Sequence, residues 1–343
     1  MAQQRKYRVG LIGAGAIAQG CHAPGYAKSD RVELVAFADP AQARHGEMTE
    51  RFEGIRGYKD YASMLQEEQL DIVSVCTPNA AHAEPTIAAL EAGCHVLCEK
   101  PMAVTLEETD AMIAAAKQAR KKLMIGFTHR MMTGPEKCRE MLRVGGIGKP
   151  FMMRVRFAHG GPYPGWAKDP NTFYRPEISA GGAMLDMGIH AIDLCNWIMG
   201  PVVSVTATCK TIMKRIKVDD NAVLLLEFKN GALGYIEVGW TSKPGFTGLE
   251  VYGSEGSLIC DYLKGLTLFG GKASAGQDSV AEWQMLDLTP TQGGWDMEIE
   301  HWLDVVAGDA RIHMDGKAGR AALEVALAAY ESSRTGRRIT LGA

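Results

Sequence analysis

The sequence predicts two domains: an α/β domain built on a doubly wound parallel sheet, followed by an α+β domain with a large, mostly antiparallel, open-faced sheet. Three observations lead to this prediction. The chain has 343 residues, which is more than one typical hydrophobic core accommodates. Up to about residue 127, short apolar runs alternate with helical segments, whereas strand-like segments with turn residues between them dominate beyond residue 200. We place the domain boundary after residue 128, giving domains 1–128 and 129–343.

Short, continuous apolar runs mark the expected strands of the first domain. Runs of this kind are typical of parallel strands that helices cover on both faces. They occupy 7–12, 32–38, 72–76, 95–98 and 123–127. We expect helices between and after them, near 16–27, 41–52, 60–67, 83–92 and 105–120. The last of these opens with Thr105-Leu-Glu-Glu108, the pattern of a capping box. Alternation of this kind implies right-handed crossovers.

The second domain has a different rhythm. Asn230-Gly231, between two strand-like runs, is a strong hairpin signal. A mostly antiparallel sheet with helices on one face leaves its other face uncovered, so we expect a homodimer or homotetramer formed through this sheet. The expected elements are a helix over 135–143, a strand near 149–159, an irregular loop over 160–180, a buried helix over 182–199, strands between 201 and 288, and helices over 295–308 and 315–334.

Composition narrows the range of partners and compartments. A net charge of −3 argues against nucleic acid or an anionic membrane surface as a partner. No run of 18 apolar residues indicates a membrane span, and the N-terminal residues lack a signal-peptide pattern, so we expect a soluble cytoplasmic protein. The eight cysteines are scattered without a CxxC pair and are expected to be reduced and mostly buried.

A glycine-rich turn after the first strand predicts a dinucleotide site. Gly13 permits the tight turn, Gly15 lets the backbone approach a pyrophosphate, and Ala18 allows close helix–strand packing. Asp39 ends the second strand, where it can accept hydrogen bonds from ribose hydroxyls and would repel a 2′-phosphate. We therefore expect NAD rather than NADP. The cofactor contacts expected on these two segments are Gly13, Gly15, Ala16, Ile17 and Asp39.

The helix predicted over 182–199 carries polar residues in an otherwise apolar segment. Asp186, His190 and Asp193 follow one another at i, i+4 and i+7, which places them on one face. Burying such groups is costly unless they are paired or face a wet cavity, so this stripe indicates either an internal site or a satisfied structural network. For Asp193, a buried helix–helix hydrogen bond is as well supported as a role in the site.

Two further segments follow strands of the first domain at their carboxyl ends, where cofactor pockets of open α/β sheets form. The first contains Thr77, Pro78, Asn79 and His82. The second is Glu99-Lys100-Pro101, in which a lysine between an acid and a proline is a candidate active-site cation.

Together these motifs resemble the Gfo/Idh/MocA family of oxidoreductases along essentially the whole chain. The resemblance is carried by GAGAIA, CTPNAAHAEPTIAALEAGCHVLCEKPMA, AGGAMLDMGIHAIDL and the closing YESSRTGRRITL. It implies a Rossmann NAD-binding domain and a nicotinamide enzyme acting on a sugar, polyol or related hydroxyl compound. It also implies that Lys100 is the active-site lysine and that Asp186 and His190 are the aspartate–histidine pair.

On this basis His190 is the candidate general base for a substrate secondary hydroxyl, with an unperturbed pKa near 6.5, as hydride leaves the same carbon for nicotinamide C4. Lys100 would stabilise the developing alkoxide, and Asp186 would orient the substrate or the imidazole. Glu99 would place Lys100 or the nicotinamide ribose, while Thr77 and Asn79 line the cofactor. The candidate substrate contacts are His129, Arg130, His159, Trp166 and Tyr174.

Three functions remain open at this point. The favoured one is a dehydrogenase that releases NADH. A redox-neutral glycosidase or lyase acting through a 3-keto sugar would use the same residues, and a non-catalytic dinucleotide sensor would not need a complete proton-transfer set. Asp186 and His190 are also spaced to bind a metal, but no third ligand joins them in the pattern, so we assign none.

Overall fold

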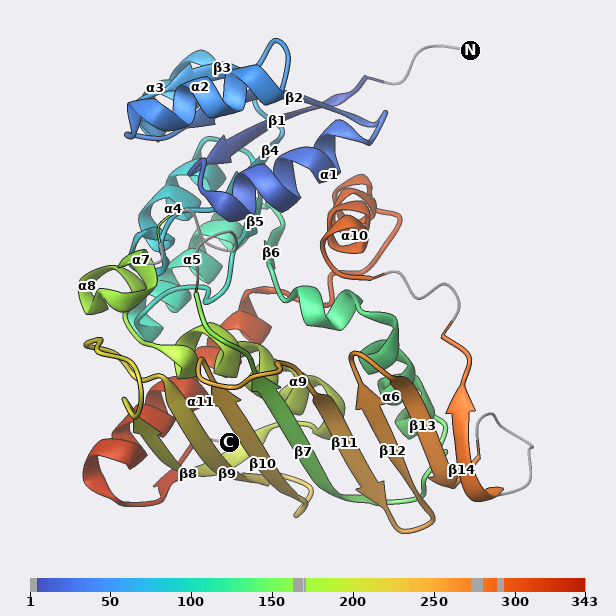
Figure 1. The fold of residues 1–343 in the computed structure, drawn as a ribbon. Coiled ribbons are helices and arrows are strands. Elements are labelled where there is room, and N and C mark those ends of the chain that lie inside the picture. The colour runs from blue at the N-terminus through green and yellow to red at the C-terminus, as the bar shows by residue number, and fades with distance from the viewer. Residues whose placement is uncertain (1–4, 163–168, 170, 273–279, 289–292, 343) are drawn as a thin grey trace.

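The computed structural model describes residues 5–162, 169, 171–272, 280–288 and 293–342, and it confirms the predicted fold class. The first sheet has six parallel strands in the order β3-β2-β1-β4-β5-β6 (Figure 1). All five predicted strands are present. The remaining one, β3, is only three residues long and largely exposed, so it carries no apolar run. The strands are β1 (Tyr7–Ile12), β2 (Val32–Ala38), β3 (Arg56–Tyr58), β4 (Ile72–Val75), β5 (His95–Cys98) and β6 (Leu123–Ile125).

Helices follow these strands where the sequence predicts them. The segment after the glycine turn begins with a π-helical turn, η1 (Ala18–His22), before continuing as α1 (Ala23–Ala27). The capping box is complete, with Glu108 N donating to Thr105 Oγ1 and Thr105 N donating to Glu108 Oε2. The other helices of this domain are α2 (Gln42–Arg51), α3 (Tyr61–Glu67), α4 (Ala83–Glu91) and α5 (Leu106–Ala119).

The second sheet has nine strands in the order β14-β13-β12-β11-β7-β10-β9-β8-β15. Only the β7–β10 pair is parallel, so the sheet is mostly antiparallel as predicted. Gly231 adopts φ +84° in the hairpin between β9 and β10, which confirms the Asn-Gly turn. The strands are β7 (Pro150–Ala158), β8 (Val202–Lys210), β9 (Asn221–Phe228), β10 (Leu233–Gly239), β11 (Gly248–Gly253), β12 (Gly256–Asp261), β13 (Gly265–Gly270), β14 (Val280–Leu286) and β15 (Ile339–Thr340).

Helices α6 (Thr133–Arg143), α9 (Ile189–Met199) and α11 (Gly316–Thr335) pack on one face of this sheet (Figure 1). Helix α10 (Trp295–Ala307) instead lies against α1 of the first domain. Short helices α7 (Asn171–Tyr174) and α8 (Pro176–Ser179) lie in the loop after β7. Among the described residues, no helix combines the length and apolar character needed to span a bilayer.

The single helix predicted over 182–199 is divided in the structure. Its first part is a π-helical turn, η4 (Met184–Gly188), and only the second part is the α-helix α9. π-Turns of this kind often occur at functional sites. The change of period alters the direction of Asp186 relative to the helix that follows, so a regular 3.6-residue stripe does not describe all three polar residues.

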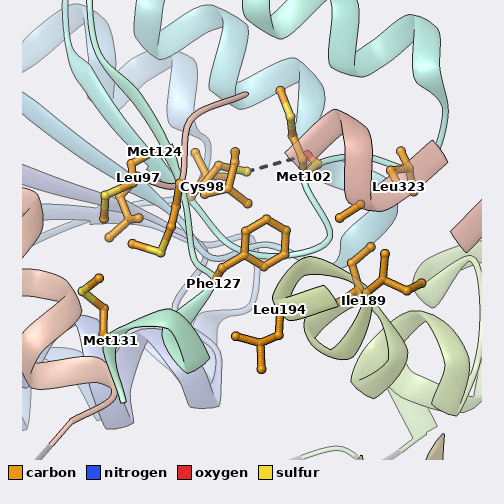
Figure 2. Packing of buried hydrophobic residues seen from close by; sticks show 14 of the residues in the cluster. Leu97, Cys98, Met102, Met124, Phe127, Met131, Ile189, Leu194 and Leu323 are labelled. Atoms are coloured by element: carbon orange, nitrogen blue, oxygen red, sulfur yellow. Dashed lines mark hydrogen bonds between the residues drawn. The ribbon is translucent and has the colours of Figure 1, made fainter. Parts of the chain in front are cut away.

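One buried hydrophobic cluster runs through both domains. Figure 2 shows this junction: Phe127, just after β6, lies between Cys98 and Met102 on one side and Ile189 and Leu194 of α9 on the other. This packing fixes α9 relative to the carboxyl end of the parallel sheet. The site residues of the two domains are therefore held on one continuous core.

Candidate active site

The glycine turn has the conformation that a dinucleotide site requires. Gly13 has φ +91°, and a Cβ atom there would lie 2.6 Å from the carbonyl oxygen of Cys76, so only glycine fits. At Gly15 a Cβ atom would meet no heavy atom within 4 Å. Ala18 is completely buried, whereas Ala16 is exposed and Ile17 half-buried. The backbone at Gly15 is therefore open to a phosphate group at the start of the helix.

Asp39 lies beside this turn at the end of β2. Its Oδ2 accepts a hydrogen bond from Ala14 N at 2.8 Å, and its Oδ1 accepts one from Ala41 N at 2.8 Å. Each carboxylate oxygen retains a lone pair for a ribose hydroxyl. The geometry thus fits the role predicted for Asp39, with the carboxylate oriented by the glycine turn itself.

The segment after β4 connects several loops. His82 is 1% exposed, and its Nδ1 and Nε2 lie 2.7 and 2.8 Å from the carbonyl oxygens of Pro101 and Thr77. A side chain in this position connects the two loops. These contacts do not show the direct contact with a nucleotide that the sequence predicts for His82. Asn79 Nδ2 donates to the carbonyl oxygen of Ser179 at 2.8 Å. Thr77 and Asn79 are half-buried and Pro78 is exposed at the same edge of the sheet.

Glu99 lies between the glycine-turn helix and the active-site lysine. His22 Nε2 is 2.8 Å from Glu99 Oε1, and Lys100 N donates to Glu99 Oε2 at 3.2 Å. Burial favours the neutral carboxyl group, but the hydrogen bond and charge of His22, with the charge of Lys100, hold the pKa of Glu99 below its usual value. Glu99 is therefore an anion that connects η1 to Lys100. No local pattern pointed to His22, because its imidazole meets Glu99 through a contact between residues 77 positions apart.

A second buried carboxyl group lies near Glu99. Glu298 of α10 is completely buried, and its Oε2 accepts a hydrogen bond from Thr128 Oγ1 at 2.9 Å. Burial and the charge of Glu99 raise the pKa of Glu298 well above its usual value. The raised pKa favours the protonated form of Glu298, which adds no second negative charge beside Glu99.

Lys100 and Asp186 meet at the junction of the two domains. Lys100 Nζ lies 2.8 Å from Asp186 Oδ1 and donates to the Asp186 carbonyl oxygen at 3.1 Å. The other carboxylate oxygen, Oδ2, accepts from the indole nitrogen of Trp240 at 3.2 Å. The side chains of Lys100 and Asp186 are 18% and 8% exposed, so the ion pair is shielded but reachable. Trp240 was not singled out in the sequence because it ends an apolar strand and resembles ordinary core.

His190 lies one helical turn beyond Asp186. Its ring centroid is 4.4 Å from that of His129 and 6.3 Å from that of Phe127. Its Nδ1 has no hydrogen-bond partner in the described part of the chain. Burial, with the neighbouring His129 and the charge of Lys100, lowers the pKa of His190 well below its usual value. The expectation of an unperturbed imidazole was therefore wrong, because a nearly apolar environment and a nearby ammonium group both disfavour the imidazolium.

Comparison with known proteins places this arrangement in a family. Residues 7–127 match the model described as an oxidoreductase family with an NAD-binding Rossmann fold, and residues 136–259 match the GFO/IDH/MocA C-terminal domain. The chain is 32% identical to the myo-inositol 2-dehydrogenase of Thermotoga maritima, over 76% of this chain and 77% of the relative. The chain belongs to the Gfo/Idh/MocA family of oxidoreductases.

Other members of the Gfo/Idh/MocA family extend this similarity over nearly the full length. The D-glucoside 3-dehydrogenase of Escherichia coli is 28% identical, with 97% of each chain covered. The structure of the WlbA dehydrogenase from Bordetella pertussis in complex with NADH and UDP-GlcNAcA superimposes with a TM-score of 0.83 at 27% identity, covering 99% of this chain and all of that one. The chain is thus an NAD-binding oxidoreductase of the Gfo/Idh/MocA family.

Aromatic side chains surround the imidazole of His129, the ring that lies beside His190 in this family member. His129 Nδ1 lies 3.0 Å from the hydroxyl of Tyr262, and burial and the charge of Lys100 lower the pKa of His129 to about 3. The rings of Tyr262 and Phe246 stack with centroids 5.4 Å apart and planes at 8°. Because these residues follow different strands of the second sheet, no local pattern in the sequence pointed to them.

His159 and Tyr174 lie around Met187 and Trp240. His159 Nε2 is 3.2 Å from the sulfur atom of Met187, and Gly161 N donates to His159 Nδ1. Tyr174 donates its hydroxyl hydrogen to Pro162 O, and its ring centroid is 6.0 Å from that of Trp240. Trp166, also expected near the substrate, lies outside the described residues.

Arg130 and Asp193 form a buried ion pair away from Lys100. Arg130 Nε donates to Asp193 Oδ2 at 2.7 Å, and Arg130 Nη1 donates to the His313 carbonyl oxygen at 2.6 Å. The two residues are 4% and 1% exposed. The structure therefore gives Asp193 a helix-anchoring partner and leaves Arg130 facing that partner rather than the mouth of the site. Among the described residues, no group of three metal-ligating side chains includes Asp186 and His190.

Proposed function

We propose that this chain is an NAD-dependent dehydrogenase that oxidises a secondary hydroxyl of a sugar, inositol or other polyol, or glycoside, with hydride transfer to nicotinamide C4. The observation that carries the proposal is the contact between Lys100 and Asp186, with His190 one turn away, at the same sheet edge as the glycine turn. The names of the inositol and glucoside dehydrogenases among its relatives support a secondary ring hydroxyl as the oxidised group.

The side chains of the site supply proton transfer and charge stabilisation. Bound NAD would supply the acceptor for the hydride that leaves the substrate carbon. His190 takes the hydroxyl proton, and its low pKa keeps it unprotonated throughout the neutral range. The Lys100 ammonium group donates a hydrogen bond to the oxygen as negative charge develops there. Asp186 holds Lys100 in place, and the indole of Trp240 fixes the second oxygen of that carboxylate.

Asp39 supports a preference for NAD over NADP. Both of its oxygens are oriented by backbone N–H groups, which leaves a fixed negative charge where the adenosine ribose hydroxyls would lie. A 2′-phosphate would meet this charge directly. On the substrate side we propose His129 and His159 as contacts, since both lie near His190 or Asp186.

The face of the second sheet opposite helices α6, α9 and α11 supports the formation of a homodimer or homotetramer. The described strands present apolar side chains there that are 39–62% exposed, beside the ion pairs Arg154–Glu250 and Arg156–Glu237. Exposed apolar groups gathered on one sheet face are typical of an interface. We therefore propose that residues 1–128 bind the cofactor and that 129–343 bind substrate and a second copy of the chain. The exposed apolar residues on this face include Val223, Leu225, Leu233, Phe269, Trp283 and Met285.

A substrate panel tests the proposed activity. Purified protein is incubated with NAD and a series of sugars, inositols and glycosides, and NADH is followed by its absorbance. Net NADH formation with at least one of them is the expected result. Turnover of a glycoside without NADH accumulation would indicate the redox-neutral reaction, and NAD binding without turnover of any compound would indicate a sensor.

A further inference from the structure

A hollow of about 260 Å³ lies beside the proposed catalytic carboxylate. Trp240 lines this hollow, and the indole nitrogen of Trp240 donates a hydrogen bond to Asp186 Oδ2. The hollow and the Lys100–Asp186 pair therefore share a side chain. The residues lining it are Gly160, Met213, Lys214, Trp240, Thr241 and Lys243.

Two lysines line this hollow and give it a positive charge. Within the described part of the chain, neither Lys214 nor Lys243 takes part in an ion pair, in contrast to Lys100. Lys214 is half-buried, and its Cε lies 3.1 Å from where a Cβ atom on Gly161 would be. A half-buried ammonium group with no counter-ion is a ready site for an anion.

The loop that carries Lys214 is held in place by one carboxylate. Asp220 Oδ2 accepts hydrogen bonds from Lys214 N at 2.7 Å and Met213 N at 2.9 Å, and Oδ1 accepts from Ile212 N at 2.7 Å. The carboxylate of Asp220 is thus occupied by the loop backbone, not by the lysine side chain. The position of Lys214 follows from this anchored turn.

The charge of Lys214 acts on His159, a residue of the proposed site. The pKa of His159 is lowered by burial and by the charges of Lys100 and Lys214. Lys100 is paired with Asp186, whereas Lys214 and Lys243 have no such partner among the described residues and lie around the hollow that Trp240 also lines.

We propose that Lys214 and Lys243 bind an anionic substituent of the substrate, a carboxylate or phosphoryl group, while the exposed side chain of Met213 contacts an apolar part of the same molecule and the buried Trp240 forms the floor of the hollow. The inference rests on the proposed function and narrows it: the substrate class becomes acidic sugars rather than neutral ones. Ammonium groups bind either anion as point charges, so the two lysines alone do not distinguish a sugar acid from a phosphorylated sugar.

Matched pairs of probes test this proposal. D-Glucuronate and the uncharged D-glucuronamide differ by one negative charge on the same ring, and D-glucose 6-phosphate and D-glucose form the phosphoryl pair. Binding to the NADH complex is measured by calorimetry, which requires no turnover, and NADH formation with NAD is measured in parallel. The variants are the double substitution Lys214→Gln with Lys243→Gln, and Lys229→Gln, an exposed lysine at the hairpin of β9 and β10.

At low salt we expect at least one anionic probe to bind about tenfold or more tightly than its uncharged partner, with the difference shrinking as salt rises. The double variant should lose this preference, and Lys229→Gln should keep it. Equal binding of charged and uncharged probes, no binding of either anionic probe, or a preference that survives in the double variant would overturn the proposal. If the lysine-dependent preference is found but no sugar yields NADH, the anion site stands and the proposed dehydrogenase activity fails.

Discussion

The pair of imidazoles at the site makes stability depend on pH. The pKa of His129 is about 3 in the folded chain, whereas an exposed imidazole has a value near 6.5. Below that value the unfolded chain takes up a proton that the folded chain does not, so stability is fully present at neutral pH and is lost as pH falls from about 6.5 toward 3. At about 1.4 kcal/mol per pH unit, His129 alone accounts for a loss of roughly 2–3 kcal/mol between about pH 7.5 and pH 4.5.

The variant His129→Phe tests this directly, because phenylalanine keeps a ring beside Phe157 and Tyr262 but cannot be protonated. Urea unfolding of the variant should show a loss on acidification that is about 2–3 kcal/mol smaller than in the unsubstituted protein. Tyr262→Phe is the control, since it removes the hydroxyl partner of His129 but leaves the buried imidazole. Equal losses on acidification in His129→Phe and the unsubstituted protein would refute the reasoning.

Three further outcomes are expected. Gly13→Ala should lower NADH affinity at least about tenfold in a fluorescence titration, because its φ of +91° and the nearby carbonyl exclude a side chain, while Gly20→Ala, which meets no neighbouring atom, should not; equal affinities would contradict this. Asp39→Ala should reduce the ratio of NADPH to NADH dissociation constants, and an unchanged ratio would assign cofactor choice elsewhere. Asp193→Ala should destabilise the fold by about 3–5 kcal/mol, because it leaves Arg130 buried and unpaired; an unfolding midpoint equal to that of the unsubstituted protein would show that the pair contributes little.

Local patterns in the sequence were sufficient for most of the fold. The glycine turn, the Thr105 capping box and the Asn230-Gly231 hairpin were predicted because each depends on neighbouring residues alone. The short strand β3 was missed because its residues are mostly exposed, and the π-turn η4 was missed because apolar periodicity does not distinguish it from α-helix.

The site was predictable only in part. Lys100, Asp186 and His190 could be identified from motifs, but their surroundings depend on contacts between distant parts of the chain. Trp240 reaches Asp186 across 54 residues, and the pKa of His190 depends on an imidazole from a different element. Periodicity also grouped Asp193 with the site, whereas its buried ion pair belongs to the helix framework.

The most direct test of the central claim is the turnover of Lys100→Met and His190→Asn with the best substrate of the panel. If the ammonium group and the imidazole act on the reacting oxygen, each variant should lose at least about 10²-fold in kcat while its NADH dissociation constant changes by no more than about threefold. A variant that forms NADH at the unsubstituted rate would show that its side chain does not take part in proton transfer or charge stabilisation.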